Sequence, residues 1–418
     1  MQGAKNILLI SYYFPPLGMG GVGRPLGLMK HLPKYGYDVT VLTVKNILYH
    51  EYDSTLLSGL DEDKIIRTGS CDPSRMLYLL GARQKPSIGF SGKSILSYLY
   101  FPDLKRGWNP FVLRAARKII KEKNISAIIT TSPPPSSHIV GLRLKKETGI
   151  PWIADFRDVW FSESIDYTYP TDFQRNFARR QRDRIIASAD KIVTVYSTIR
   201  DCLGRGEVIM NGAELEYSHG WSFATRKEKG KFVIGILGTL NRLSPIEALF
   251  KAVARLIAEK PELKDKIVIR QVGYVDRNYL ETILKIYPLR NLLALEGYHQ
   301  RFEAISHLAD ADLLYLGVFS SRVYDCLMSG KPVLGVISDS PSLSALNSPD
   351  MVSLVRDYQY GHVFSEKEED KIFSLIHNIC MKSLNNEIQS SFDISGAEKY
   401  STTRMAGEYA RLLDGILK

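Results

Sequence analysis

Short apolar runs alternate with longer amphipathic stretches along most of this chain. The first run, residues 7–10, is apolar without interruption, which is typical of a parallel strand covered on both faces. A glycine-rich loop and a helical pattern over 24–35 follow it, Gly36 ends that pattern, and the next apolar run lies at 38–43. Strand, helix and strand in this order predict a right-handed βαβ unit.

The same alternation continues on both sides of one interruption. Before it, the pattern predicts strands at 127–130, 151–155 and 191–195 and helices at 111–123, 136–148 and 172–189. It breaks around 205–230, at a turn signal and a charged run. It then restarts, with strands predicted at 232–238, 267–269, 292–295, 312–316 and 332–336 and helices at 244–259, 302–309, 322–329 and 401–417. Repeated βα units predict an α/β fold of two Rossmann-like, doubly wound domains facing a cleft.

This periodicity also suggests where the domains begin and end. We expect an N-terminal domain over 1–213, a linker over 214–230 and a C-terminal domain over 231–395. Residues 396–418 are interpreted as a terminal helix, and its return to the N-terminal domain is left open. The less regular residues 50–105 are interpreted as an insertion or a lid.

Bulk composition excludes several classes of protein. Hydrophobic residues make up 44% and charged residues 24%, which is ordinary for a globular protein. No apolar run reaches the ~18–20 residues that a membrane helix needs, and no cleavage site follows the first short run. We therefore expect a cytoplasmic protein, with peripheral attachment to the inner face of the plasma membrane left open.

Metal and nucleic-acid chemistry find little support in the sequence. The four cysteines are far apart, and the eight histidines show neither an H-E-x-x-H nor an H-x-H spacing. We therefore predict no metal site and no cofactor. The net charge of +10 favours anionic partners such as phosphates or an anionic lipid surface. Nucleic-acid binding rests on this charge alone, so we do not predict it.

Polar residues that follow the first strand are the first candidates for a site. Gly20, Gly21 and Gly23 let a ligand approach the backbone, and Arg24 begins the next helix, whose N-terminus favours an anion. The glycine spacing differs from the dinucleotide fingerprint, and no acidic residue closes the second strand. We predict a phosphate or acceptor loop here, and a tight strand–helix turn is the alternative.

Two further strand ends carry candidate catalytic groups. His138 begins the helix after the strand at 127–130, and Asp155 and Arg157 leave the strand at 151–155. The carboxyl edge of an open α/β sheet is where ligands bind. A packing role for His138 and a salt-bridged loop anchor for Asp155 and Arg157 are the alternatives.

The second half offers a candidate anion site. Gly238 follows its first strand, with Arg242 close behind. Ser320 and Ser321 precede a helix with Arg322 in its first turn, and the Asp325 carboxylate can accept two ribose hydroxyl hydrogens. These residue types suit a nucleoside diphosphate. A capped helix with a surface ion pair is the alternative.

Basic residues gather on two predicted helices of the N-terminal half. One carries Arg114, Arg117, Lys118, Lys121 and Lys123, and the other carries Arg175, Arg179, Arg180, Arg182 and Arg184. An anionic membrane surface is one interpretation, and solvated helix faces are the other. Because a helix turns about 100° per residue, the second set cannot share one face. Some of its members must pair with acids such as Asp183 or point into the cleft.

Several motifs together resemble those of family 4 retaining glycosyltransferases with the GT-B fold, in the branch associated with bacterial surface polysaccharides. Tyr13-Phe14-Pro15-Pro16 with the glycine loop is similar to the family's opening loop, and residues 151–160 resemble that branch. Gly297-Tyr298-His299 resembles the G-Y-x-x-H turn of the donor domain, which adds Tyr298 to the donor-site candidates. Residues 322–334 are similar to the pattern K-x-x-E-Y-L-x-x-G-K-P-V-L.

The sequence also departs from that family. Arg322 replaces the Lys of the pattern, and Asp325 replaces the Glu that holds the ribose. The first Glu of the family's E-x7-E pair would fall at Gly317, and the usual His would fall near Ser132, so both are absent. These departures leave open a catalytically impaired protein.

The resemblance implies a function and a mechanism. The C-terminal domain would bind a UDP- or GDP-linked sugar as donor, and the N-terminal domain would bind a glycan or lipid-linked acceptor. Transfer would retain the anomeric configuration without a metal ion, because arginines would neutralise the leaving diphosphate. A sugar-nucleotide 2-epimerase and a non-catalytic glycosyltransferase-like binding protein are the alternatives.

Overall fold

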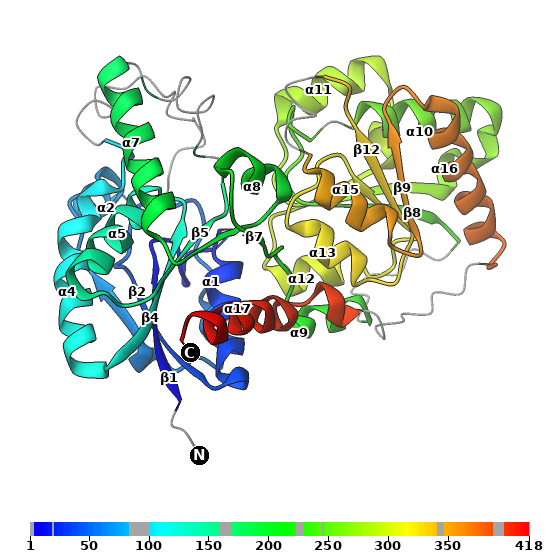
Figure 1. The fold of residues 1–418 in the computed structure, drawn as a ribbon. Helices are drawn as coiled ribbons and strands as arrows, with labels where there is room; N and C mark the ends of the chain where they lie inside the picture. The colour runs from blue at the N-terminus through cyan, green and yellow to red at the C-terminus, as the bar shows by residue number, and fades with distance from the viewer. Residues whose placement is uncertain are drawn as a thin grey trace. The chain divides into compact units, whose positions relative to one another are not determined.

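The computed structural model describes residues 4–18, 21–82, 101–158, 160, 169, 171–222, 230–244, 246–340, 347–387 and 397–417. The chain divides into two compact units (Figure 1). Unit 1 consists of Met1–Asn211 together with Thr402–Lys418, and unit 2 is Gly212–Ser401. Unit 2 is therefore inserted, in sequence, between the main part of unit 1 and its last helix.

A parallel sheet forms the centre of unit 1. Within the described residues, seven strands lie in the spatial order β3 (Ile65–Thr68), β2 (Tyr37–Val44), β1 (Lys5–Ser11), β4 (Ile125–Ser132), β5 (Trp152–Phe156), β6 (Lys191–Thr194) and β7 (Glu207–Val208). From β1 the chain builds outward to β3, then returns to β4 on the other side of β1. The topological switch point of this sheet thus lies between β1 and β4.

Helices cover both faces of this sheet. The core on one face joins apolar residues of β1, β2 and β4 to α1 (Gly23–His31) and α17 (Thr402–Ile416). The other face carries α4 (Asn109–Lys123) and α5 (Ser136–Thr148), and α7 (Asp172–Ser188) packs on α5. The remaining helical segments are η1 (Leu32–Tyr35), η2 (Ser54–Leu57), η3 (Glu62–Lys64), α2 (Pro73–Leu79), η4 (Arg106–Trp108) and α8 (Ser197–Leu203).

Unit 2 repeats the same plan with a second parallel sheet. In the part of the unit that the structure describes, its six strands follow the order β10 (Leu293–Gly297), β9 (Ile267–Val272), β8 (Phe232–Leu237), β11 (Leu313–Leu316), β12 (Val333–Ile337) and β13 (Gly361–Ser365). The switch point of this sheet lies between β8 and β11. Both expected doubly wound α/β domains are therefore confirmed.

The helices of unit 2 also form two layers. Its large apolar core joins the strands to α10 (Glu247–Glu259), α11 (Arg277–Ile286) and α16 (Glu369–Leu384). On the other side lie α12 (Arg301–Ser306), α13 (Arg322–Leu327) and α15 (Pro349–Arg356), as Figure 1 shows. The shorter segments are α9 (Leu215–Ser218), η5 (His219–Ser222), η6 (Pro261–Lys266), η7 (Arg290–Leu292) and η8 (Ala397–Tyr400).

Two regions differ from the sequence-based picture. Residues 215–222, expected within a linker, form α9 and η5, and η5 packs against α12 of unit 2. The region 50–105 contains β3 and α2 as regular elements, while residues 83–100 lie outside the described residues. Trp221 anchors η5, because its buried indole Nε1 donates a hydrogen bond to the Asp325 carbonyl at 3.1 Å.

Close packing between α5 and β5 generates a stability prediction. A Cβ atom on Gly141 would lie 2.4 Å from Cε2 of the buried Trp152, so Gly141→Ala forces the indole or the helix to move. We expect it to cost about 1–3 kcal/mol of unfolding free energy. The matched control is Gly415→Ala in α17, where no atom lies within 4 Å and the alanine favours the helix. Thermal denaturation followed by circular dichroism compares them, and equal midpoints would contradict the packing argument.

Candidate functional site

The switch point of unit 1 brings together the predicted glycine loop and the end of β4. Because Ser11 of β1 pairs in register with Thr131 of β4, both strands end at the same edge of the sheet. Gly21 follows β1, and Gly23 is the first residue of α1. Gly20 lies outside the described residues. Among the described residues, no atom lies within 4 Å of a Cβ placed on Gly21.

Arg24 has a different environment from the one expected. Its guanidinium is buried and forms an ion pair with Asp155 at the end of β5, with Nε 3.0 Å from the carboxylate. It also donates to the Ile209 carbonyl at 2.8 Å and to the Tyr409 hydroxyl at 2.8 Å. Asp155 is fully buried and accepts a further hydrogen bond from Thr131. These two side chains bind each other and the fold, which matches the salt-bridged alternative stated for Asp155.

The charge state of this pair follows from its surroundings. Burial lowers the pKa of the Arg24 guanidinium, but the Asp155 carboxylate and Tyr409 raise that pKa by more, so the net shift is upward. Burial raises the pKa of the Tyr409 hydroxyl well above its ordinary value, and the phenol stays neutral. The result is a fixed ion pair at the base of the glycine loop.

Arg157 remains the cation of unit 1 that suits a ligand best. It is 8% exposed, its Nε donates to the Ser132 carbonyl at 2.7 Å, and its Nη1 donates to the Gly21 carbonyl. Among the described residues, its buried Nη2 has no hydrogen-bond partner. Burial lowers the pKa of Arg157, with Asp155 and Asp158 acting in the opposite direction. A buried, directed donor beside an open glycine backbone can receive an anionic or hydroxyl oxygen.

His138 is a buried neutral group. Its ring lies 4.3 Å from that of Phe156, and Nδ1 is 2.8 Å from the Thr130 hydroxyl, which also accepts from Trp152 Nε1. Burial lowers the pKa of His138 from 6.5 to about 3. Between these two pH values, the ring is therefore protonated in the unfolded chain and neutral in the folded protein. Native stability supplied by the neutral ring therefore falls as the pH drops through that window. The packing alternative describes this environment better than a general base at neutral pH.

The switch point of unit 2 gathers most of the predicted donor residues. Gly238 follows β8, and a Cβ atom there would lie 2.9 Å from Cδ and Nη1 of Arg322, the first residue of α13. Gly238 also has a φ of +121°, which favours glycine. Burial lowers the pKa of Arg322, and Asp325 opposes that shift. The chain thus packs a partly buried guanidinium directly against the Gly238 backbone, at the edge where such sheets bind ligands.

Asp325 is held by a residue that the sequence analysis did not single out. Its buried carboxylate accepts from Nη2 of Arg301 at 2.7 Å and from Nε at 3.1 Å. Arg301 is the first residue of α12, three positions after Tyr298, whose ring stacks on that of Tyr274 at 5.2 Å. Ser320 and Ser321 are partly buried immediately before α13. Arg322, Asp325 and Arg301 therefore form one charged group.

Arg242 lies apart from this group, on an exposed turn after β8. It lines a cavity of about 440 Å3 together with Glu247, Tyr279, Ser338 and Glu366. Tyr279 donates to Glu247 at 2.6 Å, and burial followed by this hydrogen bond raises the pKa of the phenol. Arg242 thus faces two carboxylates.

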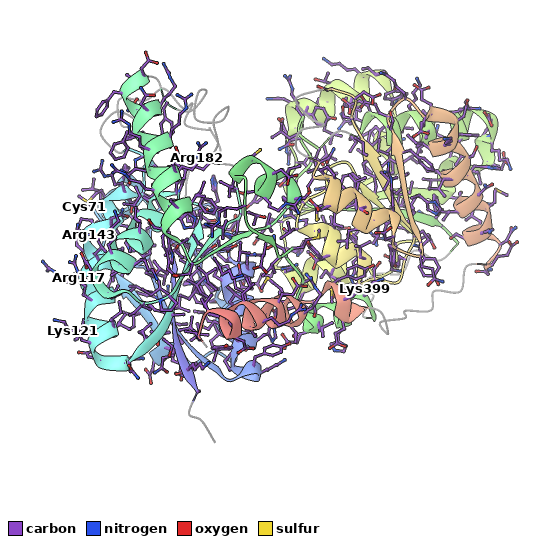
Figure 2. All side chains as sticks on the ribbon, in the orientation of Figure 1. Cys71, Arg117, Lys121, Arg143, Arg182 and Lys399 are labelled. Carbon is purple, nitrogen blue, oxygen red and sulfur yellow. The ribbon has the colours of Figure 1, made fainter. Side chains whose placement is uncertain are left out.

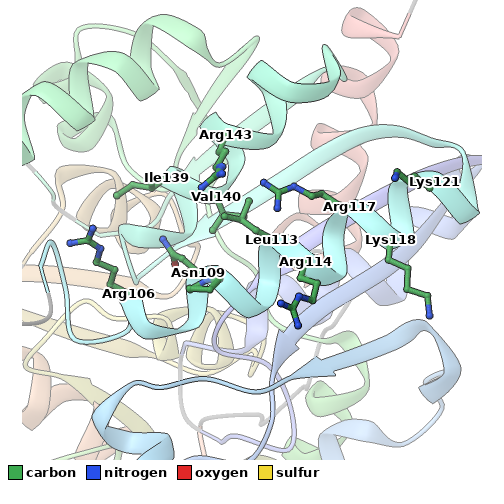
Figure 3. A pocket seen from close by; sticks show the side chains of 11 residues that line it. Arg106, Asn109, Leu113, Arg114, Arg117, Lys118, Lys121, Ile139, Val140 and Arg143 are labelled. Atoms are coloured by element: carbon green, nitrogen blue, oxygen red, sulfur yellow. The ribbon is translucent and has the colours of Figure 1, made fainter.

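A basic groove runs between α4 and α5 in unit 1 (Figure 3). Its volume is about 780 Å3, and its basic lining residues are Arg106, Arg114, Arg117, Lys118, Lys121 and Arg143. Figure 2 shows that Arg117, Lys121 and Arg143 lie on the same side of the unit. Arg117 and Arg143 both bond Glu147. On α7, Arg182 pairs with the adjacent Asp183, which is one of the two alternatives expected for the arginines of this helix.

A match to a family model adds to the structural description of the two switch points. Residues 20–208 match the model of the glycosyl transferase 4-like domain. Unit 1 is built on a glycosyl transferase 4-like domain. With the doubly wound sheet of unit 2, the chain has the GT-B fold, as the resemblance implied.

The chain is also similar to a curated protein and to several solved structures. A D-inositol 3-phosphate glycosyltransferase from Kribbella flavida is 29% identical over 108 residues, which cover 24% of this chain and only 25% of that protein. Sucrose-phosphate synthase from Thermosynechococcus elongatus superposes with a TM-score of 0.63 over 99% of both chains at 14% identity. A putative UDP-N-acetylglucosamine 2-epimerase from Listeria monocytogenes gives a TM-score of 0.51 at 12% identity, covering 97% of this chain and 95% of that chain. These structural likenesses show the fold.

The buried pair in the glycosyl transferase 4-like domain leads to a stability prediction. Arg24→Ala leaves the buried Asp155 carboxylate without its partner, and we expect a loss of about 3–5 kcal/mol of unfolding free energy. The control is Arg255→Ala, whose side chain is 46% exposed in its pair with Asp370 and should leave the midpoint close to wild type. Urea denaturation followed by tryptophan fluorescence measures both. Similar midpoints for the two variants would rule out a structural role for Arg24.

Proposed function

We propose that this protein is a retaining glycosyltransferase that moves a sugar from a nucleotide-sugar donor to a glycan or lipid-linked acceptor in bacterial surface-polysaccharide assembly. The observation that carries the proposal is the charged group at the switch point of unit 2, where Arg322 lies against Gly238 and beside Asp325. The family match of unit 1 supports the same conclusion. The donor sugar would be linked to UDP or GDP, and the leaving nucleoside diphosphate would be anionic.

Each member of that group has a chemical task in this proposal. Arg322 neutralises the diphosphate as the bond between the anomeric carbon of the sugar and the diphosphate oxygen breaks. This removes the need for a metal ion in the transfer step. Asp325 accepts hydrogen bonds from the ribose hydroxyls and gives up part of its contact with Arg301, which can then reach the phosphates. Arg157 receives an acceptor oxygen beside the Gly21 backbone in unit 1.

The direct test is a screen of UDP- and GDP-sugars with the purified protein. Released nucleoside diphosphate and a glycosylated product are expected, in the presence of EDTA, with the anomeric configuration of the donor retained by nuclear magnetic resonance. Formation of a C2 epimer instead would favour the epimerase alternative. Binding without turnover for every donor and acceptor would favour a non-catalytic binding protein.

The donor group makes a prediction on nucleotide affinity. We expect Arg322→Ala and Asp325→Ala each to weaken binding of the cognate nucleoside diphosphate by about 2–5 kcal/mol, because each removes a partner of a buried charged contact. The control is Arg290→Ala, which lies before β10 and therefore at the opposite edge of the parallel sheet. Isothermal titration calorimetry gives the affinities. Unchanged affinity in both site variants would contradict the proposal that this group binds the nucleotide.

The basic groove supports a second part of the proposal, attachment to an anionic membrane surface. None of the helices in the described part of the chain combines the length and apolarity that crossing a bilayer requires. Arg114, Lys118 and Lys121 are exposed along α4, and each basic residue near an anionic surface contributes roughly 1 kcal/mol. A lipid-linked acceptor would then encounter unit 1 at the membrane surface, where the acceptor resides.

Replacement of Arg114, Lys118 and Lys121 by Glu should therefore weaken binding to anionic vesicles by at least about 3 kcal/mol. The matched control carries Glu at Lys264, Lys266 and Lys285, which are exposed on unit 2 and give the same change in net charge. Sedimentation with phosphatidylglycerol vesicles at low salt is the measurement, with neutral vesicles and high salt as references. Equal pelleting of the two triple variants would refute the role of the groove.

A further inference from the structure

A cluster of two histidines and a glutamate surrounds α12 of unit 2. His299, Glu303 and His307 each offer one ligand atom, and these atoms all lie within 4.8 Å of one another. Successive members are four positions apart in sequence: His299 precedes α12, Glu303 lies within it and His307 follows it. The sequence analysis searched for other histidine spacings and did not detect this one.

Hydrogen bonding at His299 shows why the cluster suits a cation. Its Nε2 is 3.2 Å from the Glu296 carbonyl, which can only accept, so this nitrogen carries the proton. In the neutral ring, Nδ1 is then an acceptor, and it faces the Glu303 carboxylate at 3.1 Å. Two lone pairs at that distance repel unless a proton or a metal ion lies between them. A backbone carbonyl that fixes the outer ring nitrogen is also what orients histidines that bind metals.

The geometry of the remaining groups fits a transition metal of the zinc type. Tetrahedral zinc, with ligands at about 2.0–2.1 Å, places them about 3.3–3.5 Å apart, so the His299–Glu303 distance is already close. The His299 and His307 ring centroids lie 4.2 Å apart, and one ligand atom of His307 lies within 4.8 Å of those of His299 and Glu303. Glu296 adds negative charge, with Oε2 3.9 Å from His307 Nδ1.

We propose that His299, Glu303 and His307 bind one divalent transition-metal ion of the zinc type, with water completing the coordination. The two imidazole ligands favour zinc and its neighbours over magnesium or calcium, which prefer oxygen ligands alone. The ion would fix the turn around Arg301, which holds Asp325 at 2.7 Å, and so steady the proposed donor group without entering the transfer step. Arg270 already fixes the backbone of this turn by donating to the His307 carbonyl at 2.9 Å.

The test is metal binding by the full-length protein after treatment with EDTA and dialysis. Titration with Co2+ should show one ion per chain and a visible d–d spectrum without a thiolate charge-transfer band, because the exposed Cys71 and Cys202 are not ligands. Zn2+ should displace the cobalt. The double variant His299→Gln/His307→Gln should lose at least about tenfold in affinity, since even outer partners of metal ligands contribute 10- to 100-fold.

Two controls make the result decisive. His377→Gln changes a histidine of α16 that stacks on Phe373 outside the cluster, and it should bind cobalt like the wild type. Circular dichroism of each variant shows whether it is folded. A wild-type protein that binds no cobalt, a spectrum with a thiolate band, or unchanged affinity in a folded double variant would overturn the site. Because this assay reads metal binding and not sugar transfer, its outcome is separate from that of the proposed function.

Discussion

The buried ion pair between Arg24 and Asp155 is the contact on which unit 1 depends. It joins the first turn of α1 to the end of β5, and the same guanidinium bonds the Ile209 carbonyl and the Tyr409 hydroxyl of α17. Four segments that are far apart in sequence therefore meet at one side chain. Since a buried charge is costly without its partner, this network specifies one arrangement of those segments.

That network also sets the position of the candidate site. Asp155 is two residues before Arg157, and Arg24 is three residues after Gly21, so the pair holds Arg157 against the glycine loop. In unit 2, Gly238 and Arg322 play the corresponding part at the switch point between β8 and β11. In each unit, an arginine lies against the backbone of a glycine: Arg157 against Gly21 and Arg322 against Gly238. Both arginines therefore lie at the carboxyl edge of a parallel sheet, where open α/β sheets bind ligands.

Much of this arrangement could be predicted from the sequence, because strand ends in parallel sheets are recognisable from apolar runs and glycines. The roles of Arg24 and Asp155 could not, since a polar residue at a strand end looks the same whether it meets a ligand or a partner 131 positions away. Arg301 was missed because only the fold brings α12 beside α13 and Asp325. The strands β3 and β13 were missed because each is short and carries few apolar residues. The helix α16 was missed although its buried Ile372, Ile376, Ile379 and Cys380 follow helical spacing.

The insertion of unit 2 between Asn211 and Thr402 has a consequence for synthesis in the cell. Residues 402–417 leave the ribosome only after all of unit 2, yet their α17 covers the core of unit 1 and supplies Tyr409 to Arg24. During translation, the apolar face of unit 1 that α17 covers therefore stays exposed until unit 2 has been synthesised. Unit 2 can already fold in that interval. Chaperone dependence and sensitivity to premature termination should be concentrated in this interval.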